Sequence, residues 1–129
     1  ALFKEYGLRQ QVHTSAVKFA PELEEGLRSG YLQAVTSVDA GTRETYLKAK
    51  GRDRHEVVWQ NVTRYASTGG NMALKYILRH DNSDPENVLA FVEHCKTAGI
   101  KTVAITPDMR EIAQHTDHLE PIELGMSDP

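Results

Sequence analysis

The amino-acid sequence predicts an α/β fold made of parallel-sheet βα repeats, and the placement of its apolar residues supports this prediction. Apolar runs recur along the chain, and each ends abruptly in small, polar or charged residues, at 11–15, 32–41, 72–82 and 101–108. A helix-like segment separates each run from the next, as in the βα units of a parallel sheet. We therefore expect four parallel strands in sequence order, with right-handed crossovers and with the helices on one face.

The third and fourth runs indicate how the strands are buried. Both are apolar without clean alternation, at 74–78 and at 103–105. Strands of this kind are covered on both faces in parallel sheets. Two architectures fit this pattern, a small doubly wound sheet and part of a (β/α) barrel. In either one, function is expected at the C-terminal ends of the strands.

Two short helices are expected in the first half of the chain. Pro21 suits the first position of a helix over 22–27. Thr42 can cap a short helical turn that ends at Tyr46. The charged stretch 48–54 reads as a solvated loop.

Two longer helices are expected in the second half. The segment 55–67 carries an i, i+4, i+7 stripe that faces the core, formed by Val58, Val62 and Tyr65. Asp84 and Pro85 provide a cap and a first-turn proline for a helix that ends at Gly99. Its apolar face consists of Val88, Phe91, Val92 and Cys95. A further short helix is expected over about 109–115, and the acidic segment 120–129 is expected to be a mobile tail.

Size and composition restrict the classes of function. At 129 residues the chain is expected to be a single domain over 1–129. A formal net charge of −3 argues against nucleic acid as a partner, and no apolar stretch approaches the length of a membrane span. Cys95 is the only cysteine, so an intrachain disulfide is impossible and a cytoplasmic location is expected. The chain begins at Ala1 and not at a methionine, so a fragment, a trimmed form and a stand-alone relic of a larger barrel all stay open at this point.

Three segments carry a resemblance to a known family. They are Ser-Val-Asp-Ala-Gly-Thr-Arg-Glu-Thr-Tyr at 37–46, Lys-Gly-Arg at 50–52 and Asn-Met-Ala-Leu-Lys-Tyr-Ile at 71–77. Together they resemble the radical S-adenosylmethionine (SAM) superfamily, in which an acidic turn containing Asn follows, here 80–86. The resemblance covers about 10–108. It implies that the four strands are the third to sixth of a partial (β/α) barrel, a TIM-like barrel of which this chain is the C-terminal half.

The cluster-binding part of that family is missing from the chain. The family holds a 4Fe–4S cluster with a C-x-x-x-C-x-x-C loop, and this chain has one cysteine. The Gly-Gly-Glu segment that holds the methionine part of SAM in the family is also absent. The resemblance therefore implies SAM as a ligand, with the cluster only in a full-length parent. The chain alone is predicted to be inactive and to bind no cluster.

The resemblance places candidate cofactor-binding residues at two strand ends. Ser37 and Asp39 precede a glycine turn, where polar residues of the family contact the ribose and methionyl parts of SAM. From the residues alone, a barrel-interior serine and a turn-capping aspartate are the favoured interpretation. Thr14 and Ser15 end the preceding strand, where the family often has Thr-Asn, and Ser15 departs from that pattern.

Two cationic residues and one strand complete the set of candidates. Lys75 and Arg79 lie on the third strand and at its exit, where they could bind a carboxylate or phosphate or simply extend to the barrel rim. By resemblance, 103–106 would lie near adenine. Ser37, Asp39 and Lys75 are expected to point to one concave end of the sheet.

Two other patterns are better explained by structure than by chemistry. Cys95 lies on an apolar helix face and is expected to be a buried structural thiol. His115, His118 and Glu120 have spacing that could hold a metal, but they lie in a polar segment near Pro121 and are expected to be solvated.

Three hypotheses for function remain open. The first is the C-terminal portion of a radical SAM enzyme domain, which supplies the SAM ribose and adenine side of the pocket and part of the substrate rim. The second is a non-catalytic half-barrel, a binding or interaction module that self-associates as a homodimer or docks on a partner chain that completes the barrel. The third is an ordinary small α/β domain that binds a phosphate or nucleotide at its strand ends.

Overall fold

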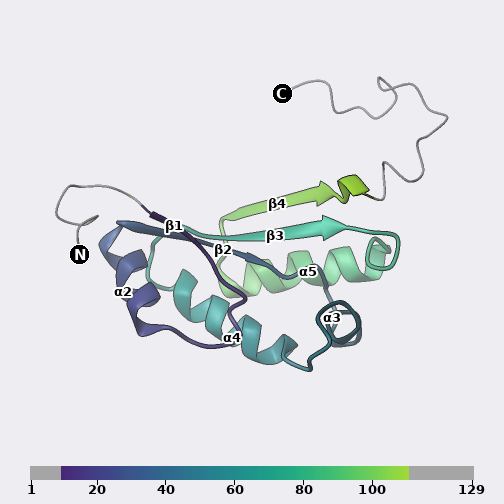
Figure 1. Cartoon of the computed structure of the whole chain (residues 1–129), viewed down its shortest axis with the longest axis horizontal. Helices are drawn as coiled ribbons and strands as arrows, with labels where there is room; N and C mark the ends of the chain where they lie inside the picture. Colours follow the sequence, from purple (N-terminus) through teal and green to yellow (C-terminus); the bar gives the residue numbers. More distant parts are fainter. Residues whose placement is uncertain (1–9, 111–129) are drawn as a thin grey trace, which may run out of the picture.

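A sheet of four parallel strands forms the centre of the molecule, as the apolar runs predict. The structure, a computed structural model, describes residues 10–110. The strands lie in sequence order, β1-β2-β3-β4 (Figure 1). Their bounds are Gln10–His13 for β1, Leu32–Ser37 for β2, Met72–Leu78 for β3 and Thr102–Pro107 for β4. The predicted α/β fold class is confirmed.

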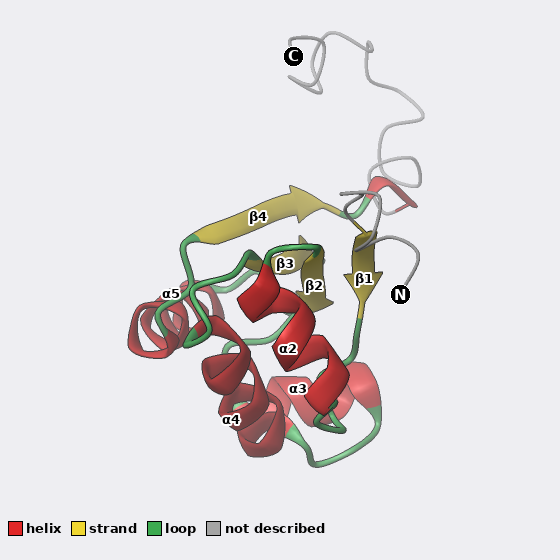
Figure 2. Ribbon diagram, turned by 90° about the vertical axis from the view of Figure 1, so that its left-hand side faces the viewer, coloured by secondary structure: helices red, strands yellow, loops and turns green. Residues whose placement is uncertain are grey.

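The four helices lie together on one side of the sheet, as expected (Figure 2). Asp84 caps the last of them by accepting a hydrogen bond from the Asn87 N–H, and Pro85 is its first residue. Pro21 begins the first, which ends at Gly30 in the left-handed conformation. The bounds are Pro21–Ser29 for α2, Arg43–Lys50 for α3, His55–Ala66 for α4 and Pro85–Ala98 for α5.

The prediction of a loop over 48–54 is wrong in its first part. Thr42 does cap α3, through a hydrogen bond from the Thr45 N–H, but the helix continues past Tyr46 to Lys50. Gly51 then ends it with a φ of 74°. Lys48 and Lys50 lie in the last turn, where cations interact favourably with the helix dipole. The charges that suggested a loop are therefore the C-terminal charges of a helix.

The expectation that both faces of the strands are covered is also wrong for the described residues. Side chains of β2 and β3 alternate between buried and half-exposed positions. The helix side holds the buried residues Ala34, Thr36, Met72, Leu74 and Tyr76. The opposite side, which we call the open face, holds half-exposed residues such as Val35, Ser37, Ala73, Lys75 and Ile77. The strands therefore carry apolar residues on both faces, but within residues 10–110 only the helix side is covered.

The helix side of the sheet contains the core. The stripe Val58, Val62 and Tyr65 is buried, and the Tyr65 hydroxyl accepts a hydrogen bond of 2.7 Å from the Ala20 N–H. Cys95 is 5% exposed, and burial raises the pKa of its thiol to about 11. It is therefore a structural thiol, as predicted. No helix in residues 10–110 is long and apolar enough to cross a membrane.

Several expectations fall outside the described residues. A helical turn begins at Met109, but most of the helix expected over 109–115 lies beyond the last described residue. The same holds for His115, His118 and Glu120 and for the tail expected over 120–129.

An aromatic cluster joins α4 to α5. The Trp59 Nε1–H donates a hydrogen bond of 3.1 Å to Nε2 of His55, which is 7% exposed. His94 stacks on Trp59, with 4.9 Å between the ring centroids. Burial, and then the neighbouring His94, lower the pKa of His55 from 6.5 to about 4. A neutral His55 is therefore part of the packing between the two helices.

Protonation of His55 should weaken the fold. Because the unfolded chain binds this proton more readily than the folded chain, stability should be complete above about pH 6.5 and should fall as the pH drops toward 4. Urea unfolding, followed by the fluorescence of the single tryptophan Trp59, measures this. His55→Gln keeps an acceptor and does not titrate, so it should flatten the dependence. An equally steep loss of stability in this variant would contradict the assignment.

Candidate functional site

Two shallow clefts lie on the open face near the carboxyl ends of the strands. The β1–β2 cleft, of about 290 Å³, is lined by His13, Thr14, Ser15, Ser37, Tyr46 and Lys50 among others. The β3–β4 cleft, of about 560 Å³, is lined mainly by Lys75, Ile77, Arg79, Thr106, Met109 and Arg110. Parallel strands bring these polar ends to one edge of the sheet, which is where α/β proteins place their ligands.

Ser37 and Lys75 are direct neighbours across the sheet. They pair in the register of β2 and β3, and both lie on the open face. Ser37 lines the β1–β2 cleft and Lys75 lines the β3–β4 cleft. Within residues 10–110, neither side chain has a hydrogen-bond or ion-pair partner, so both are available to a ligand.

Thr14 and Ser15 form the turn that leaves β1. Thr14 Oγ1 accepts a hydrogen bond of 3.0 Å from the Ala16 N–H, and Ser15 Oγ accepts one of 3.4 Å from the Val17 N–H. Each hydroxyl therefore stabilises the turn while it lines the β1–β2 cleft with Ser37. A hydroxyl that accepts in this way still has its own proton to donate.

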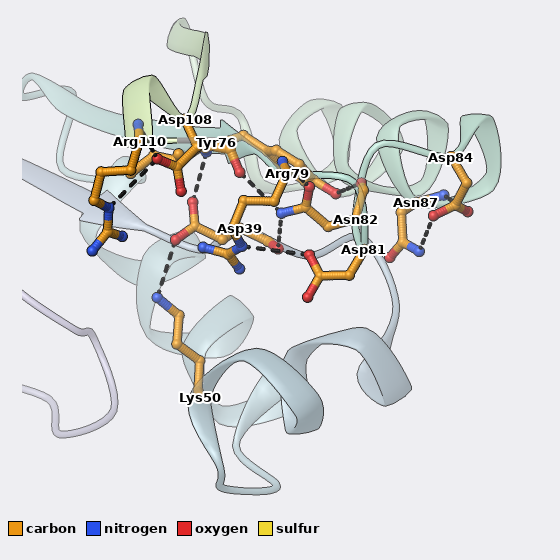
Figure 3. Close-up of polar contacts among 11 residues, drawn as sticks. Asp39, Lys50, Tyr76, Arg79, Asp81, Asn82, Asp84, Asn87, Asp108 and Arg110 are labelled. Atoms are coloured by element: carbon orange, nitrogen blue, oxygen red, sulfur yellow. Dashed lines mark hydrogen bonds and ion pairs between the residues drawn. The ribbon is translucent and has the colours of Figure 1, made fainter. Parts of the chain in front are cut away.

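Asp39 lies at the same end of the sheet, but its carboxylate turns toward the protein. Its Oδ1 accepts a hydrogen bond of 2.7 Å from the Ile77 N–H, and its Oδ2 lies 3.3 Å from Lys50 Nζ (Figure 3). The backbone of Asp39 has a φ of 58°, a left-handed conformation that Asp tolerates better than most residues. The Asp39 side chain is 6% exposed. Asp39 thus ties the end of β2 to β3.

Asn82 continues this network and is fully buried. Its Nδ2 donates hydrogen bonds of 3.0 Å to the Asp39 carbonyl and 2.9 Å to the Ile77 carbonyl. Its Oδ1 accepts one of 2.7 Å from the Arg79 N–H, and its own carbonyl accepts one of 2.6 Å from the Tyr76 hydroxyl. Burial, with Asp84 and Asp39 nearby, raises the pKa of Tyr76 to about 12, so the phenol remains a donor.

Asn87 makes the corresponding connection on the helix side. Its Oδ1 accepts hydrogen bonds of 3.1 Å from the Gly41 N–H and 3.2 Å from the Thr42 N–H, and its Nδ2 donates to Asp84. A Cβ on Gly41 would lie 1.8 Å from the Asn87 carbonyl oxygen. Gly41 therefore lets the loop after β2 approach the start of α5 closely.

Asn82 and Asn87 are structurally important residues that do not stand out in the sequence. The only signal is the acidic turn at 80–86, in which Asn82 lies two residues before the helix cap at Asp84. Asn side chains donate and accept, so they suit positions that face both carbonyl and N–H groups. Neither the partner strand nor the partner loop can be assigned from spacing alone.

The described residues offer no metal centre. No group of three or more His, Cys, Asp and Glu side chains in residues 10–110 has the geometry to hold a metal ion. Cys95 lies on α5 within the core on the helix side. The polar groups that line the clefts are hydroxyl groups, cationic side chains, the His13 imidazole and the Asp108 carboxylate.

Substitutions at Asp39 should separate its acceptor role from its charge. Asp39→Asn keeps an oxygen for the Ile77 N–H and tolerates the positive φ, so it should cost less than about 1 kcal/mol. Asp39→Ala leaves that N–H without its acceptor and strains the backbone, so it should cost roughly 2–4 kcal/mol. Chemical denaturation measures both. Equal costs for the two variants would show that the hydrogen bond to Ile77 does not stabilise the fold.

Known proteins with a similar fold extend these observations. No protein-family model matches the chain, and no curated protein matches it. A solved structure of SuiB from Streptococcus suis has a similar fold, with a TM-score of 0.69, 14% identity and 81% of this chain covered. SuiB bound to S-adenosylmethionine has a TM-score of 0.68, and SuiB bound to its precursor peptide SuiA has one of 0.69, both at 14% identity and 81% coverage.

The match covers only part of SuiB. This chain spans about a quarter, 24%, of the length of the SuiB chain. At 14% identity the likeness shows the fold of this chain, an α/β arrangement of parallel strands and helices that occurs within SuiB.

Proposed function

We propose that this chain is the C-terminal portion of a radical SAM enzyme domain and supplies one wall of its SAM pocket. The observation that carries the proposal is the fold similarity to SuiB, a radical SAM enzyme, over 81% of this chain. The motifs at 37–46, 50–52 and 71–77 add separate support, because their resemblance to that family lies in the amino-acid sequence, whereas the likeness to SuiB lies in the fold.

The iron–sulfur cluster does not fit this chain. Cysteine thiolates hold such a cluster, and the single thiol, Cys95, is buried in the core on the helix side. In the proposed enzyme the cluster belongs to another part of the protein, and this chain contributes binding.

The polar residues of the open face fit the polar parts of SAM. We propose that Ser37, with Thr14 and Ser15, offers hydroxyl groups to the ribose and methionyl parts from the β1–β2 cleft. Lys75 borders the same region from β3. Asp39 acts as a positioning residue, because its carboxylate holds the end of β2 against Ile77.

The register of β4 refines the proposed adenine contact. Val103 pairs with Leu74 and Ile105 with Tyr76, which places both β4 residues on the helix side. Ala104 pairs with Lys75 and Thr106 pairs with Ile77, which places them on the open face. If adenine lies against β4, Ala104 and Thr106 are the residues that meet it.

One observation favours a second candidate, a half-barrel that self-associates without catalysis. Val103 and Ile105 are 41% and 42% exposed although they lie on the helix side. Full burial of an exposed side chain of this size is worth roughly 1.5–3 kcal/mol, so covering the remaining exposed surface of each one would stabilise an assembly by roughly 0.6–1.2 kcal/mol. A second copy that packs on β4 would therefore stabilise the chain.

SAM should bind weakly to the isolated chain, with a dissociation constant on the order of 1 mM, because the methionine-binding half is absent. NMR titration of the ¹⁵N-labelled chain with SAM measures this. Ser37→Ala should weaken binding by roughly three- to tenfold, the effect of one hydrogen bond. Ser67→Ala is the matched control, because the exposed Ser67 hydroxyl donates to the Arg64 carbonyl and Ser67 lines neither cleft.

Equal SAM affinities for the wild type and Ser37→Ala would contradict the proposed pocket. Analytical ultracentrifugation of the same samples tests the second candidate. A concentration-dependent dimer that shows no SAM-induced shifts would favour the self-associating half-barrel over the radical SAM enzyme portion. A monomer at all concentrations would rule out the half-barrel that self-associates.

A further inference from the structure

The β3–β4 cleft is cationic although the chain as a whole is acidic. Lys75, Arg79 and Arg110 line it, and Asp108 is the one acidic residue among the lining residues that lie within 10–110. The net charge of the chain is −3. Three cationic side chains from the ends of two adjacent strands therefore lie together in a chain whose net charge is negative. Such a concentration of one sign in a cleft attracts ligands of the opposite sign.

The acidic groups near the cleft are already engaged. Asp108 is 7% exposed, and its Oδ1 accepts a hydrogen bond of 2.9 Å from the Arg110 N–H and lies 3.6 Å from Arg110 Nε. Asp81 lies 3.4 Å from Arg79 Nε, but its side chain is 56% exposed. Asp39 is held by Ile77 and Lys50.

The ion pairs of Arg79 and Arg110 are weak enough for a bound anion to replace them. Each pair has one solvent-exposed partner, Asp81 at 56% and Arg110 at 88%, and ion pairs that reach solvent contribute little to stability, so a ligand can compete for the arginine side chains. Lys75 has no ion-pair partner among residues 10–110, and it lies on the open face beside Ile77. An incoming anion would therefore meet one unpaired cation and two cations that are weakly paired.

The rest of the cleft is apolar. Ile77, Pro107 and Met109 contribute to its lining, and Met109 is 54% exposed. Thr106 adds a hydroxyl on the open face. A cleft lined by both apolar and cationic side chains suits a ligand that carries a charged group on an apolar body.

We propose that the β3–β4 cleft binds the substrate through an oxyanion, a carboxylate or a phosphate carried on an apolar body. Lys75, Arg79 and Arg110 supply the charge-assisted hydrogen bonds, and Ile77 and Met109 contact the apolar part. The inference rests on the proposed function and names its substrate class. It assigns the ribose and methionyl parts of SAM to the β1–β2 cleft, leaves adenine at Ala104 and Thr106 on β4, and assigns the substrate to the cationic side chains of the β3–β4 cleft.

The test uses the full ¹⁵N-labelled chain and three probes. They are the capped peptides acetyl-Leu-Glu-Leu-amide and acetyl-Leu-Gln-Leu-amide, and inorganic phosphate. The Glu peptide should shift the amide signals of Ile77, Arg79 and Arg110 and should bind roughly tenfold more tightly than the Gln peptide. Phosphate that shifts the same amides at lower concentration than the Glu peptide would support a phosphate source; the reverse would support a carboxylate.

Charge variants locate the site. Lys75→Gln and Arg110→Gln should each weaken binding of the Glu peptide by roughly five- to tenfold. Lys96→Gln is the matched control, because Lys96 is 71% exposed on α5 and does not line the cleft. Amide spectra of the variants that match the wild type outside the cleft show that each one folds.

The outcomes separate this inference from the proposed function. Equal affinities for the Glu and Gln peptides, or an unchanged affinity in both cleft variants, would overturn the oxyanion site. Loss of SAM binding alone would leave the peptide result standing and would remove the SAM pocket. The inference would also be overturned if SAM displaced the Glu peptide and shifted the same amides of Ile77, Arg79 and Arg110. The oxyanion site would then be part of the SAM pocket.

Discussion

The arrangement of both clefts depends on one hydrogen bond, from the Ile77 N–H to the Asp39 carboxylate. The backbone ladder between β2 and β3 reaches its last step at the bond from the Val38 N–H to the Lys75 carbonyl. At the next step the chain after β2 turns away, with Asp39 in the left-handed conformation, and a side-chain oxygen takes the place of a strand carbonyl. The Asp39 carboxylate thus satisfies the Ile77 N–H at the point where β3 extends beyond the end of β2, and Ile77 and Leu78 continue to pair with β4.

Asn82 and Asn87 stabilise that geometry from the two loops that meet there. Asn82 donates to the carbonyls of Asp39 and Ile77, and Asn87 accepts from the N–H groups of Gly41 and Thr42. Buried polar groups that are fully hydrogen-bonded specify one arrangement, because every alternative leaves a donor or acceptor unpaired. The loop after β2 and the turn before α5 are thereby fixed together. On the open face, Ser37 and Lys75 have no side-chain partner within residues 10–110, and this leaves them able to contact a ligand.

The features that can be predicted from sequence are those with local causes. The parallel order of strands follows from apolar runs separated by helices, and the starts of α2 and α5 follow from Pro21, Asp84 and Pro85. The end of α3 is predicted wrongly, because Lys48 and Lys50 look the same in a solvated loop and in a last helical turn. The position of Ser37 on β2 beside Lys75 on β3 follows from the parallel pairing of these strands. The direction of the Asp39 carboxylate, and the roles of Asn82 and Asn87, depend on partners 38 to 46 residues away, which spacing does not specify.

The most direct test of this account is hydrogen exchange at the amide of Ile77. If the Asp39 carboxylate completes the ladder, this amide should exchange about as slowly as amides in the middle of β3, although it lies next to the end of the strand. Two-dimensional NMR in deuterated buffer measures the exchange rates residue by residue. The variant Asp39→Asn keeps an oxygen that can accept from the Ile77 N–H. Exchange of the Ile77 amide at the rate of an unprotected amide would contradict the account, because the end of β2 and the two clefts would then have no fixed connection.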